Sequence, residues 1–291
     1  MLKRGVYPAA VTPFTQDGKV DMPSVACLLA FFEAKGCTGV VLAGTNGEGP
    51  SLSAVEKRDL IKAAIPLKGD LDLILGIATC SLDEARWLCE QGAKAGATAA
   101  LVMPPSYFKE ASEEGITAWF TALLDNSPLP ILIYNFPQKT SINLCSKCIK
   151  TLAAHPQMAG LKDSSGEEQN IQDFKEAVGS KSLFMGNETL LYKALDAGWT
   201  GTISGAANVI PQWLSEIVFT YGTEAAKVKF DLILPVLETL RKSPQPATNK
   251  ALLHKYGIIA NPDVRLPLQQ IPHEALEAVQ KAVENSLGTP A

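Results

Sequence analysis

Short, nearly continuous apolar segments alternate along the chain with longer segments in which apolar residues recur at helical spacing. Apolar runs of this kind are typical of parallel strands that are buried on both faces, with helices between them. We identify eight such runs, each followed by a helical stretch such as 24–36 or 81–96. The eight predicted strands are residues 5–11, 39–45, 71–78, 99–105, 130–136, 158–164, 182–187 and 201–206.

The spacing of these units, roughly 20–33 residues, predicts one (β/α)8 TIM barrel, a closed ring of parallel strands surrounded by helices. Glycines stand where four of the helices are expected to end, at Gly36, Gly96, Gly179 and Gly198. An open, doubly wound sheet is the alternative. It would more often have about five or six strands and a G-x-G-x-x-G sequence after the first strand. Residues 12–18, TPFTQDG, lack that sequence.

The barrel pattern ends near residue 222, and helical patterns fill the rest of the chain. We therefore predict a catalytic barrel over residues 1–222 and a helical region, packed on the barrel, over residues 223–291. The predicted helices of that region are residues 224–242, 247–257 and 273–287.

Composition and charge narrow the class of partner. The chain has 291 residues, of which 46% are hydrophobic and 19% charged, and its net charge is −4. Without a basic run it is not expected to bind nucleic acid. No apolar run approaches the roughly 18 residues of a membrane helix, and the N-terminus does not resemble a signal peptide. We expect a cytoplasmic protein with small-molecule substrates and no membrane partner.

The six cysteines include one C-x-x-C pair, Cys145 and Cys148, within a predicted helix. A structural zinc site would need a second pair of ligands, which the chain lacks. No metal site is predicted there.

Functional side chains of a barrel collect where its strands end and its loops begin. Lys162 interrupts the apolar sequence of the predicted strand 158–164, and lysine is rarely buried without a reason. Burial disfavours the charged form of an amine, and a neutral amine can attack a carbonyl carbon. A nucleophile and an ion pair with Asp163 or Glu188 are equally compatible with this position.

Two tyrosines lie near the ends of other strands. Tyr134 ends the strand before that of Lys162, and its phenol could pass a proton to and from a reacting group. Tyr107 follows the sequence MPPS, in a predicted loop at the same end. Each could instead pack at the edge of the core with its hydroxyl in water.

The chain's three histidines lie away from the strand ends, at His155, His254 and His273. Their positions argue against a Ser-His-Asp triad and against a histidine-rich metal site.

A glycine-rich loop, AGTNGEGPS at residues 43–51, joins the second strand to the next helix. Such loops can bind anions through backbone N–H groups. This one lacks the G-K-[ST] ending of a nucleotide-binding loop. We expect it to hold a small carboxylate through its N–H groups and the Thr45 hydroxyl; a tight turn that binds nothing is the alternative.

Together these residues resemble the dihydrodipicolinate synthase/N-acetylneuraminate lyase family of class I aldolases. GTNGEGPSL at 44–52 resembles the family's carboxylate loop, YNFP at 134–137 its tyrosine motif, and GLKDSSG at 160–166 its Schiff-base motif. PPSYF at 104–108 resembles its loop tyrosine, and PDVRLPL at 262–268 its C-terminal signature. The order and spacing agree over the full chain.

The resemblance implies a (β/α)8 barrel in which Lys162 forms an imine with the keto group of pyruvate or a pyruvate-derived substrate. Tyr134 would be the general acid and base, and Thr45 and Tyr107 would complete a proton relay. The resemblance also implies a homotetramer built from dimers, with Tyr107 supplied by a neighbouring subunit. No metal or organic cofactor is needed, because the imine itself accepts electrons.

The resemblance further assigns substrate binding. Thr45 and the backbone of Asn46 would bind the carboxylate, and Gly186 and Ile203 would offer main-chain contacts. Lys139 lies where the family's residue for the aldehyde half would be, and we add Glu188 as a candidate for binding that half.

Two departures from the family pattern bear on the substrate. Dihydrodipicolinate synthases usually read YN-x-P-x-R-T, where the arginine holds the carboxylate of aspartate semialdehyde, whereas this chain has Lys139. Lysine lacks the planar fork of arginine. Asn46 replaces the second hydroxyl residue of the loop, as in members resembling 4-hydroxy-2-oxoglutarate aldolase.

These departures favour an aldolase that acts on a hydroxylated 2-keto acid, such as a 2-keto-3-deoxy sugar acid or 4-hydroxy-2-oxoglutarate. Asn187 and Glu188 could accept hydrogen bonds from its hydroxyl groups. Dihydrodipicolinate synthase itself, a dehydratase of the same family and a non-catalytic barrel that binds a ketoacid are the alternatives.

Overall fold

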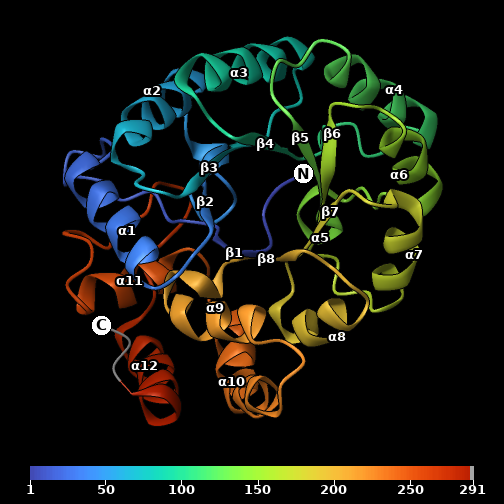
Figure 1. The fold of residues 1–291 in the computed structure, drawn as a ribbon. Helices are drawn as coiled ribbons and strands as arrows, with labels where there is room; N and C mark the ends of the chain where they lie inside the picture. Colours follow the sequence, from blue (N-terminus) through green and yellow to red (C-terminus); the bar gives the residue numbers. More distant parts are fainter. Residues whose placement is uncertain (289–291) are drawn as a thin grey trace.

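A computed structural model describes residues 1–288. Eight parallel strands form a barrel with helices around it, as Figure 1 shows. Neighbouring strands follow the order β1-β8-β7-β6-β5-β4-β3-β2, and a bridge between Ala9 and Val41 links the first two strands of the chain. The strands are β1 (Gly5–Pro8), β2 (Gly39–Leu42), β3 (Asp72–Ile77), β4 (Ala99–Val102), β5 (Ile131–Asn135), β6 (Met158–Asp163), β7 (Ser182–Met185) and β8 (Gly201–Ser204).

The predicted barrel is therefore confirmed, and the open sheet is wrong. Every predicted strand is present, but each ends one to three residues earlier than expected; β2, for example, ends at Leu42 rather than at Thr45. The difference arises because apolar and small residues continue into the loops, where Ala43 has a φ of 55° that no strand residue adopts.

Helices follow the strands, and six of the twelve α-helices in residues 1–288 begin after a residue whose side chain caps the first turn. Ser53 accepts from the N–H of Glu56 while Glu56 accepts from the N–H of Ser53, a reciprocal capping box. Positive φ angles at Gly36, Gly96, Gly179 and Gly198 accompany the helix ends predicted there. The helices up to residue 219 are α1 (Met22–Ala34), α2 (Ala54–Ala64), α3 (Leu82–Ala95), α4 (Glu113–Leu124), α5 (Pro137–Thr140), α6 (Ser146–Ala153), α7 (Gln169–Val178), α8 (Leu191–Asp196) and α9 (Pro211–Phe219). Short 3-10 helices are η1 (Gly49–Ser51), η2 (Ile65–Leu67), η3 (Glu188–Leu190) and η4 (Ala206–Asn208).

The last third of the helical shell comes from α10 (Glu224–Lys242), α11 (Ala247–Lys255) and α12 (His273–Leu287), as predicted. In Figure 1, α10 lies outside α9, which it contacts, and it also contacts η3 and α12. The division of the chain at residue 222 stays a prediction. None of the helices between residues 1 and 288 is both long and apolar enough to cross a membrane.

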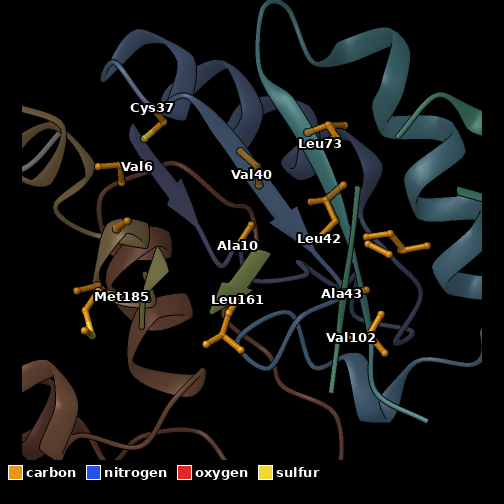
Figure 2. Close-up of a cluster of buried hydrophobic side chains, with 14 of the residues drawn as sticks. Val6, Ala10, Cys37, Val40, Leu42, Ala43, Leu73, Val102, Leu161 and Met185 are labelled. Atoms are coloured by element: carbon orange, nitrogen blue, oxygen red, sulfur yellow. The ribbon is translucent and has the colours of Figure 1, made fainter. Parts of the chain in front are cut away.

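Successive side chains of each strand point to opposite faces of the sheet, and the apolar ones form two separate clusters. The larger one lies between the strands and the helices, and Figure 2 shows some of its members, among them Val6, Val40 and Leu161. The smaller one fills the barrel interior, with Leu132, Tyr134 and Phe184 among its residues. Side chains of this inner cluster form the floor of the site described next.

Candidate active site

A cavity of about 400 Å³ lies at the carboxyl ends of the strands. Most of the predicted site residues line it. These are Thr45, Asn46, Tyr134, Lys139, Lys162, Gly186 and Glu188. The other lining residues are Phe136, Ser164, Gly205, Ala206, Leu240, Arg241, Ser243, Pro244 and Gln245.

Strand register brings Lys162 and Tyr134 together. Tyr134 of β5 pairs with Lys162 of β6, which in turn pairs with Phe184 of β7. Paired residues of neighbouring strands project from the same face, and Tyr134 and Phe184 belong to the barrel interior. The Nζ atom of Lys162 consequently lies 4.2 Å from the centre of the Tyr134 ring.

Lys162 is one of three buried lysines in the described chain, with Lys57 and Lys250. Lys250 is paired with Glu48 at 2.5 Å, and burial lowers the pKa of the Lys57 amine while nearby carboxylates, Glu84 first, oppose that shift. Only Lys162 of the three lines the cavity. It is 4% exposed, so its amine is shielded from bulk water and open to a bound molecule.

The carboxylate next to Lys162 in sequence is turned away from it. Asp163 Oδ1 accepts a hydrogen bond of 2.7 Å from the Asn135 amide, and Oδ2 accepts one of 2.7 Å from the Ser165 hydroxyl. Burial raises the pKa of the Asp163 carboxyl, and these hydrogen bonds oppose the shift. Asp163 therefore ties β6 to β5 and is not the partner of Lys162.

Glu188 is occupied as well. Its Oε1 accepts from the Ser204 hydroxyl at 2.7 Å and from the Ala206 N–H at 3.2 Å, and its Oε2 lies 3.9 Å from Arg241 Nη1. Among residues 1–288, Arg241 is the only basic side chain paired with Glu188. The ion-pair interpretation of Lys162 is wrong for both carboxylates that it named.

Tyr134 carries its hydroxyl beside a serine that the sequence analysis did not single out. The Ser164 hydroxyl donates to Tyr134 Oη at 3.3 Å, and Tyr134 is 4% exposed. The phenol thus lies within the same cavity as the Lys162 amine, with one polar neighbour of its own. A molecule bound in this cavity would therefore lie beside both the amine and the phenol.

Gly186 allows this crowding. A Cβ atom at residue 186 would lie 2.0 Å from Ser164 Oγ and 2.9 Å from Lys162 Cε. Any other residue would displace the serine or the lysine, so glycine is required here by close approach rather than by a positive φ.

The glycine-rich loop offers unpaired donors to the cavity. Thr45 Oγ1 is buried and has no hydrogen-bond partner. The backbone N–H groups of Thr45 and Asn46 also find no acceptor within residues 1–288. A buried hydroxyl without a partner is costly and uncommon, which favours a ligand with polar oxygens beside Thr45.

A buried ion pair between Glu48 and Lys250 fixes the glycine-rich loop to the C-terminal region. Glu48 has a φ of 54° and forms the 2.5 Å pair with Lys250 of α11. Its second oxygen accepts from the N–H of Arg265 at 2.8 Å, and Lys250 Nζ also donates to the Asp263 carbonyl at 2.7 Å. Burial lowers the pKa of Lys250, and Glu48 opposes that shift. The strained residue is thus fixed by groups from the C-terminal region.

Two predicted site residues do not line the cavity. Tyr107 is 77% exposed in the loop between β4 and α4, where its ring packs edge-on against Phe108. Ile203 of β8 is fully buried in the barrel interior. In addition, Asn187 turns its Oδ1 to the N–H and hydroxyl of Thr189, so its side chain caps η3.

Arg241 is a charged lining residue that was not predicted from the sequence. It lies in the last turn of α10, more than fifty residues from Glu188 in sequence, and no local motif marks it. Within residues 1–288, no group of three or more His, Cys, Asp or Glu side chains is arranged to hold a metal ion.

The fold and the cavity define a TIM-barrel enzyme site built around a buried lysine, and comparison with known proteins assigns its family. The model of the dihydrodipicolinate synthetase family matches residues 2–286. The chain is 31% identical to the 4-hydroxy-tetrahydrodipicolinate synthase of Pseudoalteromonas atlantica, over 97% of this chain and 98% of the relative. It is 32% identical to an uncharacterized DapA-like lyase of Chloroflexus aurantiacus, over 97% and 96%.

Solved structures agree with these relatives. The dihydrodipicolinate synthase of Thermotoga maritima superimposes with a TM-score of 0.92 at 26% identity, over 98% of this chain and 99% of that chain. The chloride-inhibited enzyme of Acinetobacter baumannii, complexed with pyruvate, gives a TM-score of 0.92 at 28% identity, over 97% and 98%. The chain belongs to the dihydrodipicolinate synthetase family and is a lyase of the class I aldolase type, as the sequence motifs predicted.

Proposed function

We propose that Lys162 attacks the keto carbon of pyruvate, or of a pyruvate-derived 2-keto acid, and forms an imine with loss of water. The observation that carries this proposal is a buried amine without a carboxylate partner, facing a cavity at the carboxyl ends of the strands. Thr45 and the Asn46 N–H bind the ketoacid carboxylate, because both residues line the cavity and these donors have no partner in the described chain.

Tyr134 serves as the general acid and base. It protonates the departing hydroxyl of the carbinolamine, and the imine then accepts electrons so that C3 can lose a proton and become an enamine carbon. In the direction of synthesis this carbon attacks an aldehyde, whose oxygen takes up a proton. In the direction of cleavage the same carbon–carbon bond breaks and the aldehyde leaves. Neither direction requires a metal or an organic cofactor.

Tyr107 enters this scheme through a second copy of the chain. Its exposure, its absence from the lining of its own cavity and the Thr45 hydroxyl without a partner in the described chain support a relay that is completed across an interface, in the homotetramer that the sequence resemblance implies. A complementation experiment tests it. Mixing inactive Lys162→Ala with inactive Tyr107→Phe should restore part of the activity if the tyrosine crosses subunits, and should restore none if it acts within its own chain.

Reduction with borohydride in the presence of pyruvate tests the imine. We expect a covalent pyruvate adduct on the peptide that contains Lys162 and none on the peptides of Lys57 and Lys250, the other buried lysines. Lys162→Ala should lose the adduct and all turnover while its circular dichroism stays that of the native protein. An adduct elsewhere, or turnover by this variant, would exclude the mechanism.

For the substrate that is cleaved to pyruvate and an aldehyde, we propose a hydroxylated 2-keto acid of the 4-hydroxy-2-oxoglutarate or 2-keto-3-deoxy sugar acid type. Lys139 in place of the family's arginine supports it. The second candidate is condensation of pyruvate with aspartate semialdehyde, which the names of several relatives favour. Pyruvate release from the hydroxy-keto acids, measured beside aspartate semialdehyde consumption, separates the two.

A further inference from the structure

The helix α6 begins after a cysteine. Cys145 occupies the position before its first turn, and the Cys145 Sγ atom accepts a hydrogen bond of 3.4 Å from the backbone N–H of Cys148. The five other α-helices of residues 1–288 that begin after a capping side chain use serine, threonine or aspartate. Those residues are preferred at this position because their oxygens are good acceptors, whereas a thiol sulfur accepts weakly. Helix stability alone therefore does not explain a cysteine at residue 145.

The spacing of the two cysteines suits a disulfide bond. The Cα atoms of residues three apart in a helical turn are about 5 Å apart, and a disulfide accepts roughly 4.4–6.8 Å. Cys145 is half-buried and Cys148 is buried, and the Cys148 Sγ atom lies 3.2 Å from the Thr117 hydroxyl of α4. Burial raises the pKa of the Cys148 thiol, and the Thr117 hydroxyl opposes that shift. Cys145 is therefore the thiol that a reagent meets first, at a helix N-terminus of the kind that carries reactive C-x-x-C pairs.

A cavity of about 150 Å³ gives access to both thiols. Its lining includes Cys145 and Cys148 from α6 and its N-terminus, Asn143 from the preceding segment and Lys109 from the β4 loop. Cys148 also lines a second cavity, of about 540 Å³, between α4 and α6. A small molecule can thus reach the pair without entering the barrel cavity, whose lining contains neither cysteine.

The segment before α6 connects the cysteine pair to the candidate active site. The N–H of Leu144 donates to Asn135 Oδ1 at 3.1 Å, and the Asn135 amide donates to Asp163 Oδ1 at 2.7 Å. Asn135 and Asp163 pair across β5 and β6, and each directly follows a residue that is proposed to act on the substrate. A displacement at the start of α6 would therefore reach the ends of the strands that carry Tyr134 and Lys162 through two hydrogen bonds.

We propose that Cys145 and Cys148 form a redox site, in which a small-molecule disulfide reversibly oxidises the two thiols to an intramolecular disulfide and thereby slows the enzyme. Closing this bond draws the Cys148 sulfur away from Thr117 and the Cys145 sulfur out of its capping position, so the start of α6 shifts. The effect on turnover rests on the function proposed above, whereas formation of the disulfide does not.

The exchange proceeds in two balanced steps. The thiolate of Cys145 attacks one sulfur of a disulfide such as oxidised glutathione, and the first glutathione leaves as a thiolate that takes up a proton. The Cys148 thiol then loses its proton and attacks the Cys145 sulfur of this mixed disulfide, and the second glutathione leaves and is protonated in turn. The protein loses two electrons and two protons, and the two glutathione molecules gain them. An excess of a dithiol reverses the reaction.

Peptide mapping tests the site directly. The full-length protein is incubated with oxidised glutathione, the remaining thiols are alkylated, and trypsin cuts after Lys139, Lys147 and Lys150. We expect the peptides 140–147 and 148–150 to be joined by a disulfide and to separate after reduction. The kcat of the oxidised protein, measured with the substrate that the assays above identify, should fall by about 2- to 30-fold, the range of indirect couplings between sites. Dithiothreitol should restore it.

Three cysteine variants serve as controls, and circular dichroism checks that each is folded. Cys145→Ser keeps a capping oxygen and removes the disulfide, so its kcat should equal that of the reduced wild type and should not respond to the oxidant. Cys148→Ala leaves Cys145 able to form only the mixed disulfide, which adds glutathione to the peptide 140–147. Cys80→Ser removes an exposed cysteine elsewhere, and its kcat should respond to the oxidant as that of the wild type does.

Three results would overturn the proposal. Glutathione on the exposed Cys27 and Cys80, with the peptides 140–147 and 148–150 still separate, would show that the pair is not a redox site. Joined peptides with an unchanged kcat would show that the disulfide does not slow the enzyme. An equal loss of kcat in oxidised Cys145→Ser would place the effect at another cysteine. Absence of the pyruvate adduct in the reduced protein would instead reject the proposed function, and the joined peptides would still establish the redox site.

Discussion

Two loops carry predicted site residues, and they are held in opposite ways. The loop after β2, residues 43–52, is fixed by the buried Glu48–Lys250 pair and by hydrogen bonds to Arg265. The loop after β4, residues 103–112, has one internal backbone hydrogen bond and exposes Tyr107 and Phe108. The β2 loop, which carries Thr45, is therefore held in place by contacts within one chain. We infer that the β4 loop, which carries Tyr107, is held in place only by contacts with another chain.

The two loops differ in this way because the β2 loop contains strained backbone and the β4 loop does not. Ala43 and Glu48 both have φ near 55°, a conformation that non-glycine residues hold only when their surroundings enforce it. For Glu48, the C-terminal region supplies this enforcement through Lys250 and Arg265, which lie more than 200 residues away in sequence. The β4 loop has no such residues and needs no such support.

The largest expected effect concerns chemistry that lies within one chain. Tyr134→Phe should lower kcat by about 10²–10⁴, because the phenol is the proton carrier beside Lys162. The borohydride adduct should form more slowly with an unchanged final yield. Tyr192→Phe, a change to a tyrosine on α8 away from the cavity, is the control. If kcat kept its wild-type value, the proton would have to come from elsewhere.

Tyr134 also shows how much of the site could be predicted from the sequence. The order of the predicted strands placed Tyr134 near the end of the strand before that of Lys162, and the observed register of β5 against β6 pairs the two residues. The same reasoning located the loop of Thr45, since loops at the carboxyl ends of barrel strands share one face.

The residues that were missed depend on contacts between distant elements. Arg241 stands among other charges of α10, and only the packing of that helix on η3 decides which charge faces the cavity. Ser164 was within the quoted Schiff-base motif, but its bond to Tyr134 required the geometry of β5 against β6. The strand ends were overestimated because Ala43 and Pro104 are apolar loop residues.

The next effect tests the support of the β2 loop. Lys250→Met leaves Glu48 buried without its partner, which should cost about 3–5 kcal/mol of the free energy of unfolding. Urea unfolding measures the loss, and KM for pyruvate should rise because the loop binds the carboxylate. The double variant Glu48→Gln/Lys250→Met should recover part of the stability, since no isolated charge remains. A loss below about 1 kcal/mol in Lys250→Met would show that the loop does not depend on this pair.

A smaller effect on the free energy of unfolding is expected from the partly exposed ion pair between Glu56 and Arg265. The Arg265 guanidinium holds the pKa of Glu56 at about 2, below its ordinary 4.5, and the Glu56 side chain is 34% exposed. A lowered pKa contributes stability that is present above about pH 4.5 and is lost as the pH falls through about 2. Glu56→Gln keeps a capping oxygen and removes the charge, so it should cost about 1 kcal/mol or less at pH 7. Urea midpoints of the two proteins should converge between pH 5 and pH 2; a constant difference would mean that the charge is not responsible.

The smallest effect should come from the exposed loop. Phe108 is 68% exposed and contacts Tyr107 edge-on, so Phe108→Ser should change the unfolding free energy of an isolated chain by less than about 0.5 kcal/mol. If a second copy covers these two rings in the working enzyme, the same change weakens the assembly instead. Sedimentation over a range of protein concentrations would then show dissociation at concentrations where the wild type stays associated, together with a loss of activity that higher protein concentration reverses. An unaltered assembly and activity at every concentration would mean that the two rings are not covered by another copy, and Tyr107 would lose its proposed place in the relay.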